Sequence, residues 1–298
     1  MEIRKYAAID IGSNAIRLLI ANIIISENKE PQFKKSSLVR VPIRLGADAF
    51  VSGIISDANK QRLIDAMEAF KLLMKVHNVE KYKACATSAM REASNGVKVA
   101  QEIFKKTGVK IAIIDGKEEA AIISTTDLDQ LIKKEESYLY VDVGGGSTEL
   151  TLFSKGKIKD SKSFRMGTVR LLNNTKAENK AIFKDVEQWI KSSSENLDKI
   201  SIIGSGGNIN KLFKMSGRML DKPLSYIFLN AQYKFLKNMT YDERISELGL
   251  NPDRADVIIP ATKIYLSAMK WSGATKLYVP KIGLSDGIIK SLYQGDLT

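Results

Sequence analysis

The chain has 298 residues, of which 44% are hydrophobic and 27% charged, a composition that excludes collagen-like, coiled-coil and largely disordered chains. Its 46 Lys and Arg residues outnumber its 34 Asp and Glu residues, and the net charge of +12 suits a polyanionic partner: nucleic acid, a membrane surface or a highly phosphorylated small molecule. The single cysteine, Cys85, excludes an internal disulfide and multi-cysteine zinc sites, and the single histidine, His77, excludes histidine-pair metal sites.

The first half of the chain is predicted to alternate strands and helices. Two β-rich runs, 6–11 and 16–25, flank the turn Gly12-Ser13-Asn14-Ala15 and indicate a hairpin. A helix is predicted over 57–76, because its apolar residues recur on one face. After it we expect a strand over 82–87, a helix over 95–107, a strand over 110–114 and a helix over 117–127.

The second half repeats this alternation and predicts an α/β fold. Strands over 137–143 and 148–153 flank three glycines, Gly144 to Gly146. Thr240 and Glu243 form a capping-box pattern that begins a short helix. The other elements are a helix over 177–197, a strand over 200–203, a helix opening after Gly206-Gly207, a helix over 255–271, a strand over 276–279 and a terminal helix. The polar run 127–137 is the best boundary between the halves.

No targeting or membrane segment is expected. Glu2 and Asp10 interrupt the start of the chain, which therefore lacks the apolar core of a signal peptide. The longest apolar run, 16–25, is too short for the ~30 Å of hydrocarbon in a bilayer. These features predict a soluble, cytoplasmic protein.

An internal repeat is the most informative feature of the sequence. The turn that starts at Asp10 recurs as the turn that starts at Asp142, and each lies between two β-rich runs. A later strand and turn, 202–208, has a counterpart in 85–89. The repeat predicts a duplicated α/β domain with a cleft between the copies; the alternative is a chance recurrence of Asp-x-Gly turns.

The glycine-rich turn carries the strongest chemical signal. Consecutive glycines let several backbone N–H groups approach phosphate oxygens, and Ser147 and Thr148 add hydroxyl donors. Asp142 and Glu149 flank the turn and offer the oxygen ligands that Mg²⁺ prefers. The alternative is a glycine-rich hairpin with two solvated acids. The turn that starts at Asp10 shows the same signal more weakly.

Three other groups have both a functional and a structural interpretation. Glu118 and Glu119 either complement the dipole of the helix that they open, or one of them is a general base that orients water toward a phosphoryl group. Arg91 either clamps phosphate oxygens or lies at the surface beside Glu92 or Glu102. The third group, Ser205-Gly206-Gly207 at a helix start, is either an anion-binding amide cluster or a structural turn.

The numerous lysines of the second half suit a long polyanionic substrate if some of them line a channel. Aromatic residues are sparse among them, so stacking on the bases of nucleic acids is not expected. We expect neither a nucleic-acid nor a membrane partner.

The order and content of the motifs resemble the exopolyphosphatase/pppGpp phosphohydrolase (Ppx/GppA) family. The resemblance covers nearly the whole chain and rests on AAIDIGSNAIRLLI, ATSAMREASN, IIDGKEEA, YLYVDVGGGSTEL, RMGTVRL, IIGSGGN and ADVIIPA. It implies two ribonuclease-H-like domains of the actin–hexokinase–Hsp70 superfold facing across a cleft. Domain I would span 1–124 and 284–298, and domain II would span 125–283. A homodimer is possible.

The resemblance also implies Mg²⁺-dependent hydrolysis of terminal phosphoanhydride bonds. Glu119 would be the catalytic base, and Asp142, Glu149 and Asp10 would hold the metal or its waters. The phosphates would be surrounded by Ser13, Asn14, Arg91, Gly144, Gly145, Gly146, Ser147, Thr148, Ser205, Gly206 and Gly207.

Inorganic polyphosphate is the expected substrate. Hydrolysis of the 5′-phosphate of pppGpp, a sensor that binds either ligand without hydrolysis, and an ATP-dependent kinase are the alternatives. Relatives often have arginine where this chain has Ala121 and Ser285, and glycine is common where it has Ala261. These departures bear more on the substrate than on the reaction.

Overall fold

The computed structural model describes residues 1–126, 132–133, 135–197 and 199–297. Contacts between residues divide the chain into two compact units, unit 1 (Met1–Thr126 with Gly283–Thr298) and unit 2 (Asp127–Ile282). Residues 127–131 and 134 of the predicted boundary, including Asp127 at the end of a predicted helix, lie outside the described residues.

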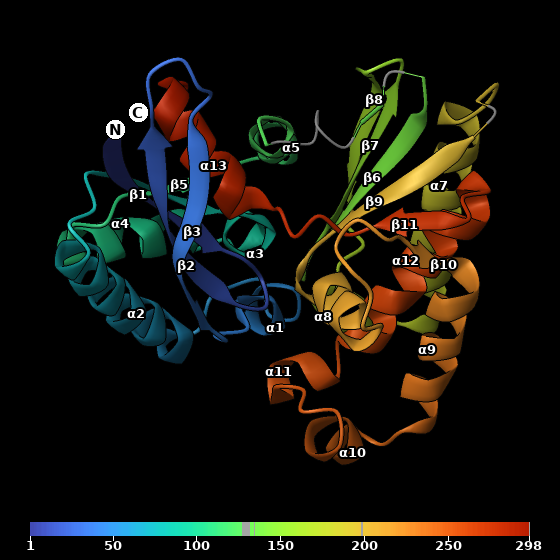
Figure 1. Cartoon of the computed structure of the whole chain (residues 1–298). Helices are drawn as coiled ribbons and strands as arrows, with labels where there is room; N and C mark the ends of the chain where they lie inside the picture. Colours follow the sequence, from blue (N-terminus) through green and yellow to red (C-terminus); the bar gives the residue numbers. More distant parts are fainter. Residues whose placement is uncertain (127–131, 134, 198, 298) are drawn as a thin grey trace. The chain divides into compact units, whose positions relative to one another are not determined.

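Unit 1 is built on a five-stranded sheet with the order β3-β2-β1-β4-β5 (Figure 1). The strands β1, β2 and β3 pair antiparallel, whereas β4 pairs parallel with β1 and β5 with β4. Their bounds are β1 Glu2–Ile11, β2 Ile16–Ile25, β3 Gln32–Val41, β4 Lys81–Ala86 and β5 Ile111–Ile113. The helices are α1 Leu45–Ala49, α2 Asp57–Val76, α3 Ser88–Glu92, α4 Gly96–Thr107, α5 Gly116–Ser124 and α13 Leu284–Gln294.

The two faces of this sheet are covered by different helices. Ile9 and Ile11 of β1 belong to one buried cluster with Met67 and Phe70 of α2 and Ile103 of α4. The helix α13 also packs on β1, β2 and β4, and it contacts α5. Because strand side chains alternate between faces, Asp10 lies on the face opposite Ile9 and Ile11.

Unit 2 repeats this plan in a six-stranded sheet with the order β10-β11-β9-β6-β7-β8. Again three consecutive strands pair antiparallel and the next strand of the sheet pairs parallel. The strands are β6 Ser137–Val143, β7 Thr148–Ser154, β8 Lys157–Phe164, β9 Ile200–Ser205, β10 Leu224–Ser225 and β11 Lys276–Tyr278. The helices are α6 Thr168–Asn173, α7 Lys176–Ser193, α8 Gly207–Met215, α9 Tyr226–Asn238, α10 Tyr241–Ser246, α11 Pro252–Ala255 and α12 Ile258–Ser272.

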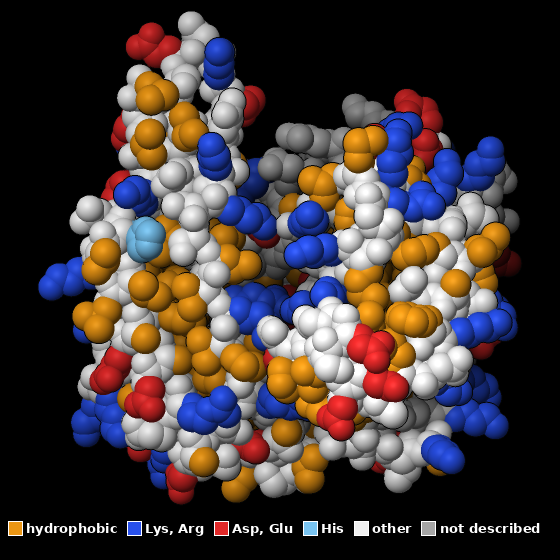
Figure 2. Space-filling view, turned by 60° about the horizontal axis from the view of Figure 1, so that its bottom comes forward, with side chains coloured by type: hydrophobic (Ala, Val, Ile, Leu, Met, Phe, Trp, Pro, Cys, Tyr) orange, Lys and Arg blue, Asp and Glu red, His pale blue; other side chains and the backbone are white. Residues whose placement is uncertain are grey.

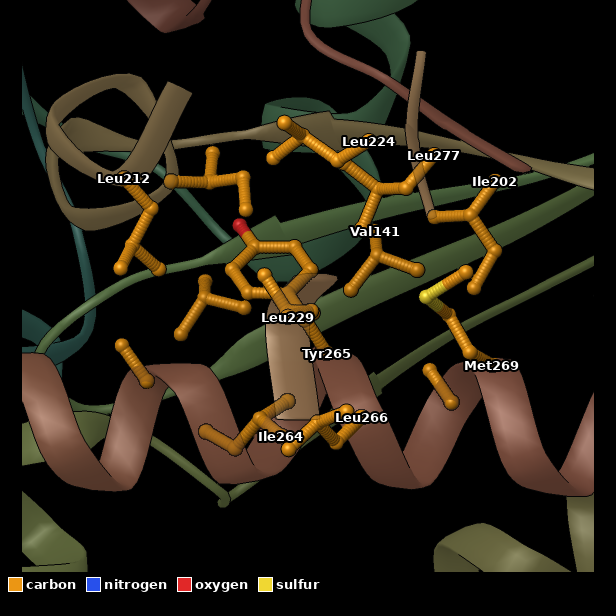
Figure 3. Packing of buried hydrophobic residues seen from close by; sticks show 14 of the residues in the cluster. Val141, Ile202, Leu212, Leu224, Leu229, Ile264, Tyr265, Leu266, Met269 and Leu277 are labelled. Atoms are coloured by element: carbon orange, nitrogen blue, oxygen red, sulfur yellow. The ribbon is translucent and has the colours of Figure 1, made fainter. Parts of the chain in front are cut away.

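The core of unit 2 contains a fully buried tyrosine. Figure 3 shows Tyr265 of α12 among apolar side chains that include Val141 of β6, Leu212 of α8 and Leu277 of β11. Its hydroxyl donates a hydrogen bond to the backbone carbonyl of Ser205, at the end of β9. Burial and the negative charge of nearby Asp142 raise the pKa of this tyrosine well above its ordinary value, so the hydroxyl remains a donor.

These two sheets confirm the predicted α/β fold, and their common strand order agrees with the predicted duplication. The elements that were not predicted include the edge strands β3 and β8, the helix α9 and the short elements α1, α3, α6 and β10. Most residues of β3 and β8 are polar, and of the two strands only Phe164 is buried, so neither strand has the alternation of buried apolar residues that marks a half-buried strand. The predicted cleft between the two copies and the predicted domain bounds stay predictions.

Cys85 lies in β4 in the core of unit 1, with 1% of its surface exposed. Burial raises the pKa of its thiol to about 12. The reactive thiolate is therefore nearly absent at pH 8 in the folded protein. We expect a thiol reagent such as DTNB to leave the native protein unmodified and to label it stoichiometrically in guanidinium chloride; rapid labelling of the native protein would contradict this placement.

In the part of the chain that the structure describes, no helix combines the length and apolar character needed to span a bilayer. Lys and Arg side chains are spread over both units on the face shown in Figure 2, with acidic side chains among them. A channel lined by a subset of the lysines stays a prediction.

Candidate active site

The two predicted turns are closed by equivalent backbone hydrogen bonds. In unit 1 the N–H of Gly12 donates to the carbonyl of Ala15 (3.2 Å), and in unit 2 the N–H of Gly144 donates to the carbonyl of Ser147 (3.0 Å). A Cβ at Gly144 would lie 3.2 Å from that carbonyl oxygen, so the closed turn favours glycine. The hairpins β1–β2 and β6–β7 therefore end in equivalent loops.

Helix α6 holds the loop of unit 2 from behind through the carbonyl groups of its glycines. The N–H of Thr168 donates to the carbonyl of Gly144 (3.0 Å), and the next two N–H groups of α6 donate to the carbonyl of Gly145 (2.8 and 3.1 Å). Nε of Arg170, a buried side chain, donates to the carbonyl of Gly146 (2.9 Å). Three consecutive carbonyls of the loop are thus fixed on the side of α6.

The N–H groups of the same peptides point the other way. In a trans peptide the C=O and the N–H of the next residue are directed oppositely, so the N–H groups of Gly145, Gly146 and Ser147 are directed away from α6. Among the described residues, none of these N–H groups donates a hydrogen bond to a protein atom. A run of backbone N–H groups turned to one side forms an anion-binding concavity.

Gly167 allows this arrangement because it lies directly against the loop. A Cβ at Gly167 would be 2.2 Å from the carbonyl carbon and oxygen of Gly145 and 2.2 Å from the nitrogen of Gly146. Real atoms do not approach so closely, so a side chain at this position would displace either the loop or α6. Neither Gly167 nor Arg170 was among the predicted site residues.

The two carboxylates of unit 2 stand side by side at the base of the loop. Asp142 and Glu149 are directly opposite in the β6–β7 register, and Asp142 is opposite Ser205 in the β6–β9 register. Residues opposite each other share one face of a sheet, so both carboxylates project to the same side. Glu149 is 4% exposed and accepts a hydrogen bond from the hydroxyl of Ser163 (2.9 Å).

The predicted amide cluster after β9 is next to this pair. Gly206 has a φ of 116°, a backbone conformation that residues with a side chain rarely adopt. A Cβ there would be 2.9 Å from the carbonyl oxygen of Val143 and 3.6 Å from Oδ1 of Asp142. The hydroxyl of Ser205 donates to the carbonyl of Ile282 (2.8 Å). The structure therefore brings the 205–207 turn to the Asp142 end of the loop, with the Ser205 hydroxyl engaged by the backbone.

The equivalent register position in unit 1 holds the opposite charge. Asp10 is opposite Arg17 as Asp142 is opposite Glu149, and Nη1 of Arg17 lies 3.1 Å from Oδ2 of Asp10. Burial raises the pKa of Asp10, and Arg17 opposes that rise. The carboxylate predicted to face the metal thus has a cationic partner within its own unit, and its role toward a metal stays a prediction.

The other predicted phosphate ligands of unit 1 lie around the first loop. The N–H groups of Gly46 and Arg44 donate to the carbonyls of Ser13 (2.7 Å) and Asn14 (3.0 Å), as α6 does in unit 2. The hydroxyl of Ser13 is 2.9 Å from that of Ser88. Both loops are therefore held through their carbonyls.

Two adjacent glutamates in the first turn of α5 have different hydrogen-bonding roles. Its N-cap residue Asp115 accepts from the N–H of Glu118 (2.8 Å), and Oε2 of Glu118 accepts from the N–H of Asp115 (2.9 Å), which completes a capping box. Glu119 takes no part in the cap and is 8% exposed. Of the two glutamates, Glu118 is the capping residue.

Arg91 lies where the chain enters α5. Its Nη1 donates to the carbonyl of Ile114 (2.6 Å), the residue that follows β5. Its charge lowers the pKa of Asp115, although the N–H groups that hydrogen-bond to that carboxylate lower the pKa more. Glu102, considered as a surface partner of Arg91, pairs instead with Lys60 (3.1 Å). The structure thus places Arg91 beside the base of the helix that carries Glu119.

Residues 24–295 match the sequence profile of the Ppx/GppA phosphatase family. The chain belongs to this family. A Ppx/GppA structure from Aquifex aeolicus superimposes with a TM-score of 0.78 at 25% identity and full coverage of both chains, in agreement with the fold expected from the resemblance.

Two relatives of this Ppx/GppA chain differ in length. The bifunctional 3-dehydroquinate synthase/phosphatase of Fusobacterium nucleatum is 29% identical over 320 residues, which cover 97% of this chain and 46% of that protein. Exopolyphosphatase 2 of Mycobacterium tuberculosis is 25% identical over 323 residues, which cover 98% and 99%. The chain therefore spans about half of the first relative and nearly all of the second.

Proposed function

We propose that the protein is an exopolyphosphatase, which hydrolyses the terminal phosphoanhydride bond of inorganic polyphosphate and releases orthophosphate. The observation that carries this proposal is the loop of unit 2, whose N–H groups at Gly145, Gly146 and Ser147 are directed away from α6, between the opposed carboxylates of Asp142 and Glu149. The full-length similarity to exopolyphosphatase 2 supports the choice of reaction.

The amides of the loop bind phosphate oxygens in this proposal. Each N–H supplies a donor whose direction is set in advance by the hydrogen bonds of its neighbouring carbonyl to α6. Donors fixed before the reaction stabilise the charge that develops on the phosphoryl oxygens without reorganising. Thr148 contributes to the loop rather than to the ligand, because its hydroxyl donates to the carbonyl of Met166.

The donor set at the base of the loop fits Mg²⁺. This ion binds through one or two carboxylates and completes its octahedron with water and substrate phosphates. Asp142 and Glu149 supply such a pair, and among the described residues no group of three or more His, Cys, Asp or Glu side chains offers a fuller protein cage. When bound there, Mg²⁺ would neutralise negative charge on the phosphates.

Glu119 acts as the general base. Its carboxylate orients a water molecule and accepts a proton from it as the water oxygen bonds to the terminal phosphorus. The anhydride bond to the next phosphate breaks, and that phosphate leaves as the new end of the chain. Burial of Glu119 limits its contact with bulk water and keeps the carboxylate in one position.

The proposal is tested by measuring phosphate release from long-chain polyphosphate and from pppGpp, each with Mg²⁺. Release from polyphosphate is the expected result. Release from pppGpp alone would keep the reaction and change the substrate, which would then need a guanosine pocket. Binding of both without hydrolysis would replace the enzyme with a sensor, and consumption of ATP together with a second substrate would indicate a kinase.

Exchanging Asp142 for Asn is expected to raise the Mg²⁺ concentration needed for half-maximal activity by about 10-fold or more, because one anionic ligand is lost. Asp185→Asn removes the same charge from the exposed face of α7 and is the matched control. Titration of activity with Mg²⁺ measures both. Equal midpoints in the two variants would contradict metal binding at Asp142.

The same titration decides the role of Asp10. If its carboxylate serves Arg17 alone, Asp10→Asn leaves the Mg²⁺ midpoint where it is in the wild type. If Asp10 contributes to the metal site, as the resemblance implies, the midpoint rises as it does in Asp142→Asn.

A further inference from the structure

Helices α5 and α13 of unit 1 meet at a glycine. A Cβ at Gly287 of α13 would lie 2.2 Å from the carbonyl oxygen of Ile122 in α5 and 2.8 Å from its carbonyl carbon. Both atoms belong to the backbone of α5, so they cannot move aside by a change of side-chain rotamer. The contact between the helices therefore requires a residue without a side chain at this position.

The end of α5 is fastened to α13 at the same place. The hydroxyl of Thr125, the C-cap residue of α5, lies 3.3 Å from the carbonyl of Gly287 and 3.2 Å from the hydroxyl of Ser291. It also lies 2.7 Å from the carbonyl of Ile122, the group that faces Gly287. The last turn of α5 is thus held by close packing and by hydrogen bonds.

The other end of α5 is attached to α3 by the hydrogen bond from Arg91 to the carbonyl of Ile114, and the capping box of Asp115 and Glu118 closes its first turn. Glu119 lies between these two attachments, three residues before Ile122, and residues with that spacing lie on one side of a helix. A shift of the backbone at Ile122 therefore moves the carboxylate of Glu119.

Helix α13 is itself braced against the sheet. Lys35 of β3 forms an ion pair with Asp286 (2.7 Å), and Phe33 of β3 meets Tyr293 edge-on, with ring centroids 5.6 Å apart. Asp286 also accepts from the N–H of Gly283 at the start of the helix (3.1 Å). Its attachments to β3 and its packing on β1 make α13 a fixed support for α5.

We infer that Gly287 is a positioning residue for the reaction: the close contact that it permits sets the place of α5 and thereby of the carboxylate of Glu119. The inference rests on the proposed function for its kinetic test, since it assumes that Glu119 is the general base. It also makes a prediction about α5 that needs no turnover.

Gly287→Ala is expected to lower kcat by roughly 10- to 100-fold with KM little changed, because small displacements of a reacting group cost that much. Hydrogen exchange of the amides of 119–124 is expected to become faster than in the wild type. Met74→Ala is the matched control, because it loosens the core on the opposite face of the sheet, where α2 packs. It should lower Tm while kcat and exchange in α5 stay unchanged.

If Gly287→Ala does not fold, Ser291→Ala is used instead, because it removes a hydrogen-bond partner of Thr125 without adding atoms. It is expected to produce the same changes in kcat and in exchange, at smaller size. Unchanged kcat together with unchanged exchange in the folded variant would overturn the inference. A third outcome separates the two proposals: exchange in α5 is faster in the variant, but the wild type cleaves neither polyphosphate nor pppGpp. That outcome would uphold the role of Gly287 in placing α5 and would refute the proposed function.

Discussion

Glu119→Gln is expected to lower kcat for polyphosphate hydrolysis by roughly 10²- to 10⁴-fold, the range that a positioned general base contributes. Glutamine has nearly the same shape as glutamate but does not accept a proton from the attacking water. Polyphosphate binding, measured by calorimetry, should remain close to that of the wild type, because the amides of the loop in unit 2 are untouched.

Glu118→Gln is the matched control, since Glu118 is the adjacent residue of the same helix and completes its cap. The control should retain turnover and lose about 1 kcal/mol of stability at most, the usual value of a capping interaction. If Glu118→Gln abolished turnover and Glu119→Gln did not, the roles assigned to the two glutamates would be reversed. If both retained it, α5 would not supply the base.

Gly167→Ala is expected to reduce both binding and turnover. The added methyl group would be 2.2 Å from the peptide that joins Gly145 and Gly146, so the loop must leave its place against α6. Loss of a fixed donor to a developing oxyanion costs about 10²- to 10³-fold in kcat, and here several donors move together. Weaker polyphosphate binding in calorimetry distinguishes this variant from Glu119→Gln.

The matched control is Gly217→Ala, in the turn after α8 of the same unit. Gly217 has a φ of 64° and no atom within 4 Å of a Cβ, so alanine introduces only backbone strain. That strain costs about 1–2 kcal/mol and should lower Tm with little change in kcat. Wild-type binding by Gly167→Ala would show that the amides of the loop do not hold the substrate.

Elements with strong local patterns were predictable from the sequence. The helix predicted over 57–76 has those bounds in the structure, since one stripe of apolar residues faces the core and Ser56 caps its start. The strand predicted over 137–143 is likewise observed. The edge strands β3 and β8 escaped prediction because pairing with a single neighbour, rather than burial, makes them strands, and such pairing leaves little pattern in the sequence.

The turn between β6 and β7 was predictable because its pattern is local in the sequence. Consecutive glycines between two acids identify the loop of unit 2 without a structure. Gly167 and Arg170 were missed because their role depends on a contact with residues more than twenty positions earlier in the chain. Position in the chain alone left Glu118 and Glu119 undecided, because both occupy the first turn of α5. The family resemblance pointed to Glu119, and the hydrogen bonds of the cap assign Glu118 to the capping box.

The loop of unit 2 presents peptide N–H groups, which every amino acid except proline possesses. Mutation of its side chains therefore leaves the chemical identity of these donors intact, and under the proposed function phosphate affinity depends chiefly on the residues that hold the loop in place. Directed evolution of this protein, aimed at altering the phosphate binding that we propose, should accordingly randomise 165–171, behind the loop, in preference to the loop itself. Variants from such a library would differ in the direction of the donors rather than in their number.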